Sequence, residues 1–104
     1  MKHLVLTVTL NPAIDQIFYV KELQKATLNK VQSSDVSAGG KGINVARALN
    51  RLGLRVTATG IAGGYSGKMM EHILRCENIA YDFVPGKEEI RFNFSVYDCK
   101  SKAI

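Results

Sequence analysis

No segment constrains the fold of this chain more than the glycine-rich stretch AGGKG at residues 38–42. The residues before it, Lys30 to Val36, alternate weakly between apolar and polar and predict an exposed strand. After it, apolar residues recur at helical spacing, which predicts a helix over residues 43–52 that ends at Gly53. A strand, a glycine-rich turn and a helix in this order are typical of α/β proteins.

The N-terminal run Leu4 to Thr9 is almost continuously β-branched or leucine and predicts a strand covered on both faces, as in parallel sheets. Pro12 ends it, because proline lacks the backbone donor and restricts the preceding residue. The other predicted elements are strands over residues 17–20, 55–61, 81–84 and 91–97, a helix with Ser66 as N-cap that ends at Asn78, and a turn at Pro85-Gly86.

The composition predicts one globular domain. Of 104 residues, 46% are hydrophobic and 22% are charged, which excludes a disordered chain. No apolar run reaches the roughly 18 residues of a membrane helix. Three core strands and two helices leave one sheet edge unpaired and one face incompletely covered. The chain is therefore expected to be part of a larger domain.

The formal net charge of +5 comes from basic residues spread along the chain, without a block or an aromatic-interleaved stripe. A solvated basic surface explains this better than nucleic-acid binding, and attraction for a small phosphorylated metabolite also fits. The cysteines, Cys76 and Cys99, form no Cys-x-x-Cys pair and are expected to be free thiols in a reducing cytoplasm. His3 and His72 have no neighbouring ligand cluster, so no metal site is expected.

Residues 38–42 are also the best candidate for a ligand site. Glycines before a helix let the backbone approach a ligand closely, and the helix N-terminus offers free N–H groups and a positive dipole end. An anion or polar ligand is the natural occupant. The spacing fits neither a Walker A loop nor the dinucleotide fingerprint. A tight turn without a ligand explains the local pattern equally well.

Three further features have both a functional and a structural explanation. The stretch GGYSGK at residues 63–68 resembles a phosphate loop superficially, but Ala62 and Met69 occupy positions where that motif needs Gly and Ser or Thr, which favours a turn with a helix cap. Asp15 follows the first strand and can bind sugar hydroxyls or satisfy a turn. Arg91 can hold a phosphate or lie on the surface.

Four motifs in fixed order carry a family resemblance: TLNPAID at residues 9–15, AGGKGINVARAL at 38–49, LG at 52–53 and GIAGGYSG at 60–67. Together they resemble the N-terminal third of the ribokinase-like sugar kinases of the phosphofructokinase B family, in the branch that includes 1-phosphofructokinases. The resemblance covers essentially the whole chain. It implies a three-layer α/β/α domain with a small β-sheet lid, built from strands near residues 16–20, 30–36 and 91–97. Homodimers through the lid occur in this family.

The resemblance also implies substrate-binding roles for six residues. Asp15 would bind sugar hydroxyls, and Lys41 would lie near the phosphorylated substrate. Gly39, Gly40 and Asn44 would line the sugar site. Arg91 would contact the substrate phosphate. In the segment EIRFN at residues 89–93, Arg91 and Asn93 match the family, whereas Ile90 replaces its usual threonine.

The reaction implied by the resemblance is the ATP- and Mg²⁺-dependent phosphorylation of a ketose phosphate, with fructose 1-phosphate converted to fructose 1,6-bisphosphate as the leading case. Tagatose 6-phosphate kinase and 6-phosphofructokinase are the alternatives within the family. The family's catalytic Gly-Ala-Gly-Asp motif and nucleotide-binding half are absent from residues 1–104, so this chain is expected to contain no catalytic residue and to be inactive alone. A non-catalytic sugar-phosphate-binding protein is the alternative of a different class.

Overall fold

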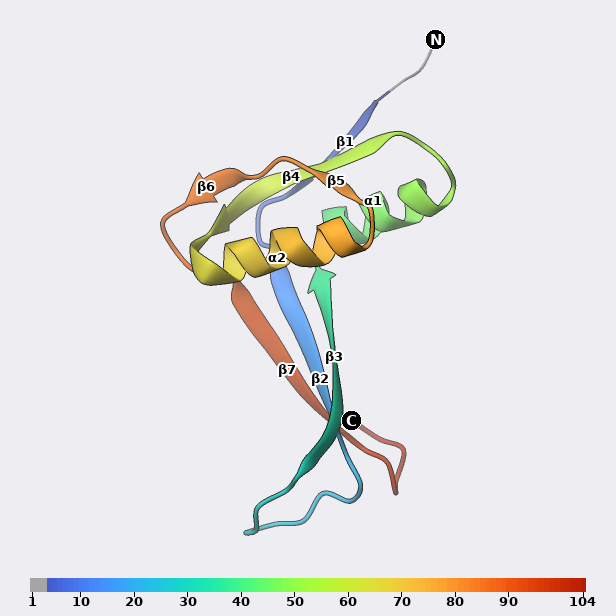
Figure 1. The fold of residues 1–104 in the computed structure, drawn as a ribbon, viewed down its shortest axis with the longest axis vertical. Coiled ribbons are helices and arrows are strands. Elements are labelled where there is room, and N and C mark those ends of the chain that lie inside the picture. Colours follow the sequence, from blue (N-terminus) through green and yellow to red (C-terminus); the bar gives the residue numbers. More distant parts are fainter. Residues whose placement is uncertain (1–3) are drawn as a thin grey trace.

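The computed structural model describes residues 4–104 as two sheets and two helices (Figure 1). The core sheet contains β1 (Val5–Thr9), β4 (Val56–Gly63) and β5 (Ala80–Tyr81) in the order β1-β4-β5, and β6 (Val84–Gly86) pairs further along β4. All pairings in it are parallel. The second sheet has the order β3-β2-β7, formed by β2 (Ala13–Val20), β3 (Val31–Gly39) and β7 (Arg91–Asp98). The helices are α1 (Lys41–Arg51) and α2 (Gly64–Cys76).

Both helices cover one face of the core sheet. Helix α1 packs on β1 and β4, and α2 packs on β4 and β5. The core joins residues of both helices to the buried face of β4, and its largest fully buried side chains are Ile14, Ile43, Met70 and Leu74. On the opposite face the apolar side chains of Leu6, Val8 and Ile61 remain exposed. The prediction of an incompletely covered sheet is therefore confirmed for the described residues.

The helix ends follow partly from the sequence. Gly53, with φ of 81°, follows the C-terminal end of α1, as its position predicts. Asn78, with φ of 58°, follows α2 in the same way. The prediction of Ser66 as an N-cap is wrong, because α2 begins at Gly64 with Gly63 as its N-cap. Ser66 lies in the first turn, where its buried hydroxyl accepts a hydrogen bond of 2.6 Å from the Ile90 N–H.

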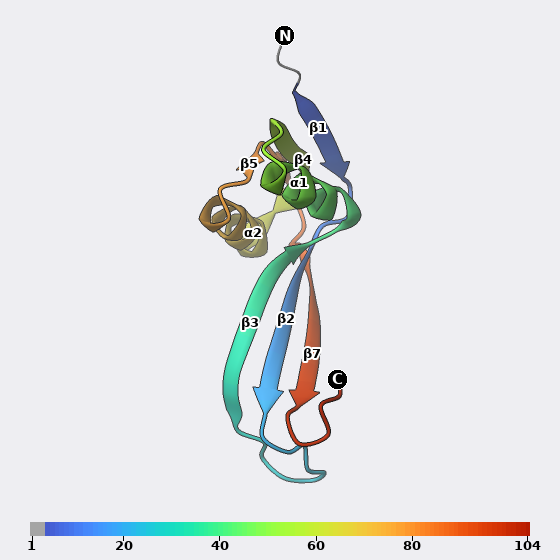
Figure 2. The same cartoon turned by 90° about the vertical axis from the view of Figure 1, so that its right-hand side faces the viewer.

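The three-stranded sheet, hereafter the lid, extends away from the helices (Figure 2). Strand β2 lies at its centre, antiparallel to β3 and parallel to β7. The predicted lid strands are present, but β2 begins at Ala13 instead of near residue 16 or 17, and β3 runs on to Gly39. Asp15 is therefore a strand residue and not a turn residue.

The C-terminal half of the core sheet also differs from expectation. The strand predicted over residues 81–84 is divided into β5 and β6, and the turn predicted at Pro85-Gly86 is the end of β6. Gly86 pairs with Gly63 at the end of β4. At either position a residue larger than glycine would place its Cβ atom too close to neighbouring atoms. A Cβ added at Gly86, for example, would lie 2.7 Å from Cγ2 of Ile61. The close approach of the two strands explains why residues with turn propensity are paired here.

Candidate functional site

A pocket of about 450 Å³ lies where the core sheet, α1 and the lid meet. The end of β1, the N-terminal turn of α1 and the first residue of β7 form its walls. Its polar lining residues are Thr9, Asn11, Lys41, Asn44 and Arg91. The carboxyl ends of parallel strands are the usual binding edge of an α/β sheet, and β1 ends at this pocket.

The N-terminus of α1 opens into this pocket. Its N-cap, Gly40, has φ of 132°, and no side chain of residues 4–104 caps the helix end. No acidic residue lies in the first turn. Free backbone N–H groups and the positive end of the helix dipole therefore face the pocket together with the backbone of Gly40 and Gly42. This combination favours an anionic ligand.

Glycine is required at Gly40 and Gly42 for steric reasons. At Gly40 the positive φ disfavours other residues, and a Cβ would lie 2.6 Å from the Cγ2 atom of Thr9. At Gly42 a Cβ would lie 2.8 Å from the Val8 carbonyl oxygen and closer still to the Thr9 hydroxyl. The glycines allow α1 to begin directly against the end of β1, which brings the helix N-terminus to the pocket.

Two cationic side chains line the pocket from opposite elements. Lys41 is the first residue of α1, and Arg91 is the first residue of β7 in the lid. The lining contains no carboxylate. Two cations and an uncapped helix N-terminus make this pocket suited to a phosphate group, which a guanidinium can hold through two parallel hydrogen bonds.

A hydrogen-bond acceptor lies beside the pocket on the lid. The carboxylate of Asp15 accepts a hydrogen bond of 2.8 Å from the Asn93 side chain through Oδ1. Its other oxygen lies directly over Gly39, where any Cβ would overlap with it. The strand register puts Asp15, Gly39, Asn93 and Arg91 on the same face of the lid. This carboxylate can accept hydrogen bonds from hydroxyl groups of a ligand held below the lid.

The structure thus brings four of the six predicted site residues to the pocket wall, namely Gly40, Lys41, Asn44 and Arg91. Asp15 and Gly39 are not in the wall but lie together on the adjoining lid face. Asn11 lines the pocket as well. Asn11 is not among the six predicted site residues, although its position in the motif TLNPAID is a sequence signal for it.

The buried hydroxyl of Thr9 also lines the pocket and has no hydrogen-bond partner among the described residues. Thr9 is not among the six predicted site residues, although it is the first residue of the motif TLNPAID. A buried hydroxyl without a partner is uncommon in folded proteins. Thr9 is the last residue of β1, and its hydroxyl faces Gly42 in the first turn of α1. This hydroxyl is a further polar group of the site.

The second glycine-rich stretch, residues 63–68, is arranged differently. The N-terminus of α2 is occupied by the carboxylate of Glu89, which accepts a hydrogen bond of 3.1 Å from the Tyr65 N–H. The Ser66 hydroxyl lies 3.3 Å from the same carboxylate. A side-chain carboxylate already satisfies this helix end, so the structure supports the interpretation of a turn with a helix cap.

No group of three or more His, Cys, Asp or Glu side chains within residues 4–104 could hold a metal ion, and His3 lies outside this range. None of the helices within the described range is long and apolar enough to cross a membrane.

Comparison with known proteins identifies the family. The family model described as pfkB family carbohydrate kinase matches residues 1–97. A 1-phosphofructokinase of Borreliella burgdorferi is 38% identical over 93 residues, which cover 89% of this chain and 30% of that protein. A D-tagatose-1-phosphate kinase of Bacillus licheniformis is 36% identical over 93 residues, with 89% and 31% covered.

Solved structures agree. Phosphofructokinase-2 from Escherichia coli in complex with fructose-6-phosphate superposes with a TM-score of 0.84 at 32% identity, covering 94% of this chain and 32% of that chain. A possible 1-phosphofructokinase from Thermotoga maritima gives a TM-score of 0.80 at 41% identity, with 95% and 32% covered. The chain spans about a third of the length of these relatives, and its α/β fold is ribokinase-like. It belongs to the pfkB family of carbohydrate kinases.

Proposed function

We propose that this chain forms the sugar-phosphate side of the active site of a carbohydrate kinase. The observation that carries the proposal is the convergence of Lys41, Arg91 and the uncapped N-terminus of α1 on one pocket that contains no carboxylate. Asp15 supplies a hydrogen-bond acceptor on the adjoining lid face. A sugar phosphate has the matching chemistry, since one end is anionic and the rest carries hydroxyl groups.

The proposed reaction is the ATP-dependent phosphorylation of fructose 1-phosphate at its 6-hydroxyl, which yields fructose 1,6-bisphosphate. Similarity to three relatives named 1-phosphofructokinase, at 38–40% identity, supports this choice. A tagatose phosphate is the second candidate, because a relative named D-tagatose-1-phosphate kinase is almost equally similar. Fructose 6-phosphate is the third, since phosphofructokinase-2 of Escherichia coli shares the fold at 32% identity.

In this proposal the residues of the chain bind and orient the acceptor sugar. Lys41 and Arg91 hold the phosphate that the substrate already carries, and the N–H groups at the start of α1 add hydrogen bonds to it. Asp15 accepts hydrogen bonds from sugar hydroxyls. Fixing the sugar at both ends orients the free hydroxyl for reaction, which lowers the entropic part of the barrier.

The pocket residues do not fit a magnesium site. Mg²⁺ is usually bound through one or two carboxylates together with substrate phosphates, and no carboxylate lines this pocket. We therefore propose that ATP and Mg²⁺ are held by parts of the kinase fold outside this chain. On this proposal no catalytic base lies within residues 4–104, and the chain alone releases no ADP. Two exposed cysteine thiols, Cys76 and Cys99, are consistent with a cytoplasmic location.

We further propose that the lid pairs with a second copy through its apolar face. This face contains Phe18, Val36, Phe92, Phe94 and Val96, which share one side of the sheet by register. Phe94 is 63% exposed and stacks on Phe92 with a centroid distance of 5.5 Å. An exposed cluster of stacked aromatic side chains is typical of an interaction surface. A homodimer through the lid would cover it.

Binding calorimetry with this chain tests the proposed substrate class. Fructose 1-phosphate should bind measurably, and unphosphorylated fructose should bind at least about tenfold more weakly, because it lacks the group that the two cations hold. Lys41→Ala and Arg91→Ala should reduce the affinity for the phosphorylated sugar only. Arg75→Ala, which removes an exposed cation of α2 that does not line the pocket, is the matched control. Equal affinities for fructose and its phosphate would refute the proposal.

A further inference from the structure

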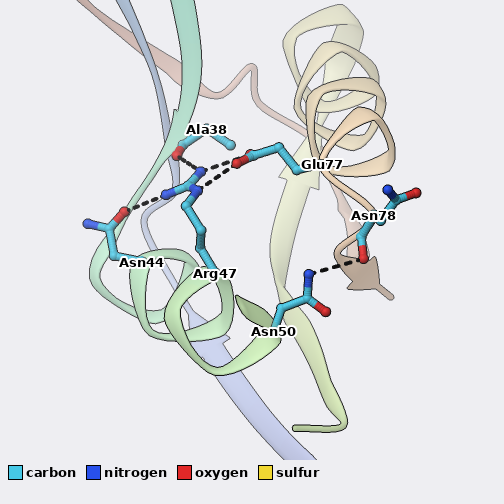
Figure 3. Close-up of polar contacts among 6 residues, drawn as sticks. All are labelled: Ala38, Asn44, Arg47, Asn50, Glu77 and Asn78. Carbon is cyan, nitrogen blue, oxygen red and sulfur yellow. Dashed lines mark hydrogen bonds and ion pairs between the residues drawn. The ribbon is translucent and has the colours of Figure 1, made fainter. Parts of the chain in front are cut away.

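Arg47, on α1, connects three elements beside the pocket (Figure 3). Its Nε donates a hydrogen bond of 2.7 Å to Oε1 of Glu77, and its Nη2 donates one of 3.0 Å to Oε2. The same Nη2 donates to the carbonyl oxygen of Ala38 at 2.9 Å, and Nη1 donates to Oδ1 of Asn44 at 2.9 Å. The guanidinium thus joins the end of α2, the end of lid strand β3 and a residue of the pocket wall.

The hydrogen bond to Asn44 determines how its amide group is oriented. A guanidinium has donors only, so the atom of Asn44 that faces Arg47 must be the carbonyl oxygen Oδ1. The Nδ2 amino group then points away from Arg47, as Figure 3 shows. Because Asn44 lines the pocket and its oxygen already accepts from Arg47, its Nδ2 amino group remains as a donor for a ligand. This suits a phosphate or hydroxyl oxygen and adds to the donors at the start of α1.

The hydrogen bond to Ala38 acts on the backbone of the same site. Ala38 immediately precedes Gly39 and Gly40, and it is buried. Its carbonyl oxygen is held by the guanidinium at the point where β3 turns into α1. Glycine allows more backbone conformations than other residues, so this contact adds a restraint to the turn at Gly39 and Gly40. Arg47 therefore restrains both the turn at Gly39 and Gly40, through Ala38, and the side chain of Asn44.

Glu77 in turn holds Arg47. Both its carboxylate oxygens are engaged, and the two side chains are 17% and 30% exposed. Hydrogen bonding between them raises the pKa of Arg47 and lowers the pKa of Glu77. A bidentate pair of this kind fixes the plane of the guanidinium, which a lysine ammonium at the same position could not do. Only with the guanidinium in this plane can Nη1 donate to Asn44 while Nη2 donates to Ala38.

We propose that Arg47 is a positioning residue of the sugar-phosphate site, held in place by Glu77 and acting through the amide of Asn44 and the turn at Gly39 and Gly40. The inference rests on the proposed function for its ligand, but its geometry is a property of the free chain. It assigns a role in the site to an arginine that does not line the pocket. It also couples the end of α2 to the site, since Glu77 caps that helix.

Double-mutant analysis separates positioning from a merely structural role. Arg47→Lys should weaken the binding of fructose 1-phosphate about tenfold, because an ammonium cannot make the hydrogen bonds to Asn44, Ala38 and Glu77 simultaneously. The same substitution in an Asn44→Ala background should cause a clearly smaller loss, because the residue through which Arg47 acts is already absent. Arg75→Lys, in the last turn of α2, is the control and should leave affinity unchanged. Equal losses in both backgrounds, or no loss in either, would overturn the inference.

A second measurement on the ligand-free chain keeps this test independent of the proposed function. In nuclear magnetic resonance spectra, Arg47→Lys and Glu77→Gln should both shift the Asn44 side-chain amide signals and speed amide exchange at Gly40 and Lys41, while Arg75→Lys should change neither. Unchanged signals at Asn44, Gly40 and Lys41 would refute positioning by Arg47. If the signals shift but the unmodified chain does not bind fructose 1-phosphate, the proposed function fails and the positioning geometry stands.

Discussion

Asn93 donates a hydrogen bond of 2.8 Å to Asp15 across two parallel lid strands, although the residues are 78 positions apart in the chain. The bond occupies Oδ1 of the carboxylate and leaves Oδ2 over Gly39. Strands β2, β3 and β7 therefore meet at the carboxylate of Asp15. In the proposed site this carboxylate binds the sugar hydroxyls, while Lys41 and Arg91 bind the phosphate.

The division between hydroxyl and phosphate recognition leads to the first prediction. Asp15→Asn should weaken binding of fructose and fructose 1-phosphate by similar factors, about tenfold, because both ligands carry the hydroxyls. Lys41→Ala should weaken binding of the phosphate ester alone. Titration calorimetry with each ligand measures both effects. A loss confined to fructose 1-phosphate in Asp15→Asn would contradict the assignment of this carboxylate to hydroxyl groups.

The close contact between Asp15 and Gly39 predicts a rescue. Gly39→Ala would push its methyl group against the end of the Asp15 side chain, which must shift, and this should cost about 1 kcal/mol in the free energy of unfolding, the low end for overpacking. Adding Asp15→Ala should restore most of that loss, as urea unfolding can show. Gly53→Ala is the matched control, because Gly53 has positive φ but no atom within 4 Å of an added Cβ. Its loss comes from backbone strain, and Asp15→Ala should not restore it.

The ion pair of Arg47 and Glu77 predicts a dependence of stability on pH. The pKa of Glu77 is lowered below its ordinary value of 4.5, mainly by hydrogen bonding to Arg47. The folded state thus binds a proton less readily than the unfolded chain, so this contribution is complete above about pH 4.5 and is lost as pH falls through the lowered pKa. Urea unfolding of the chain and of Glu77→Gln, at about pH 6 and about pH 3, should show a smaller acid loss in the variant. An equal acid loss would rule out this role for Glu77.

The apolar lid face predicts a dimer that a single charge disrupts. Phe94→Asp would bury a carboxylate in the interface and should shift sedimentation from dimer to monomer at micromolar concentrations. Leu28→Asp is the control, since Leu28 is 95% exposed in the loop between β2 and β3 and lies outside the apolar face. Leu28→Asp should remain dimeric, and dimers that persist in Phe94→Asp would place the contact elsewhere.

Local patterns predicted much of this fold. The helical spacing after residue 42 and the glycine at position 53 predicted the location and end of α1, and the structure confirms both within one or two residues. The glycine-rich turn at residues 38–42 predicted a helix N-terminus, and α1 begins there beside a pocket; that this pocket binds a ligand stays a prediction. These features depend on neighbouring residues, which is why a sequence pattern can reveal them.

The errors came from contacts between distant segments. Residues 13–16 join β2 because β7 and β3 pair with them on both sides, and neither partner is close in sequence. Glu89 lies 23 residues or more from the first turn of α2, and its carboxylate accepts the hydrogen bond from the Tyr65 N–H at that helix end. The Ser66 hydroxyl instead accepts a hydrogen bond from the Ile90 N–H. Arg47 gave no signal of its own, because its role depends on Glu77, 30 residues away.

Binding of fructose 1-phosphate at the pocket between the lid and α1 can be measured by titrating the isotopically labelled chain and following its nuclear magnetic resonance spectrum. We expect saturable shifts centred on Gly40, Lys41, Asn44 and Arg91, with fructose perturbing mainly the signals near Asp15. Shifts centred on the N-terminus of α2 around Tyr65, or the absence of saturable shifts at the four pocket residues, would contradict binding at this pocket.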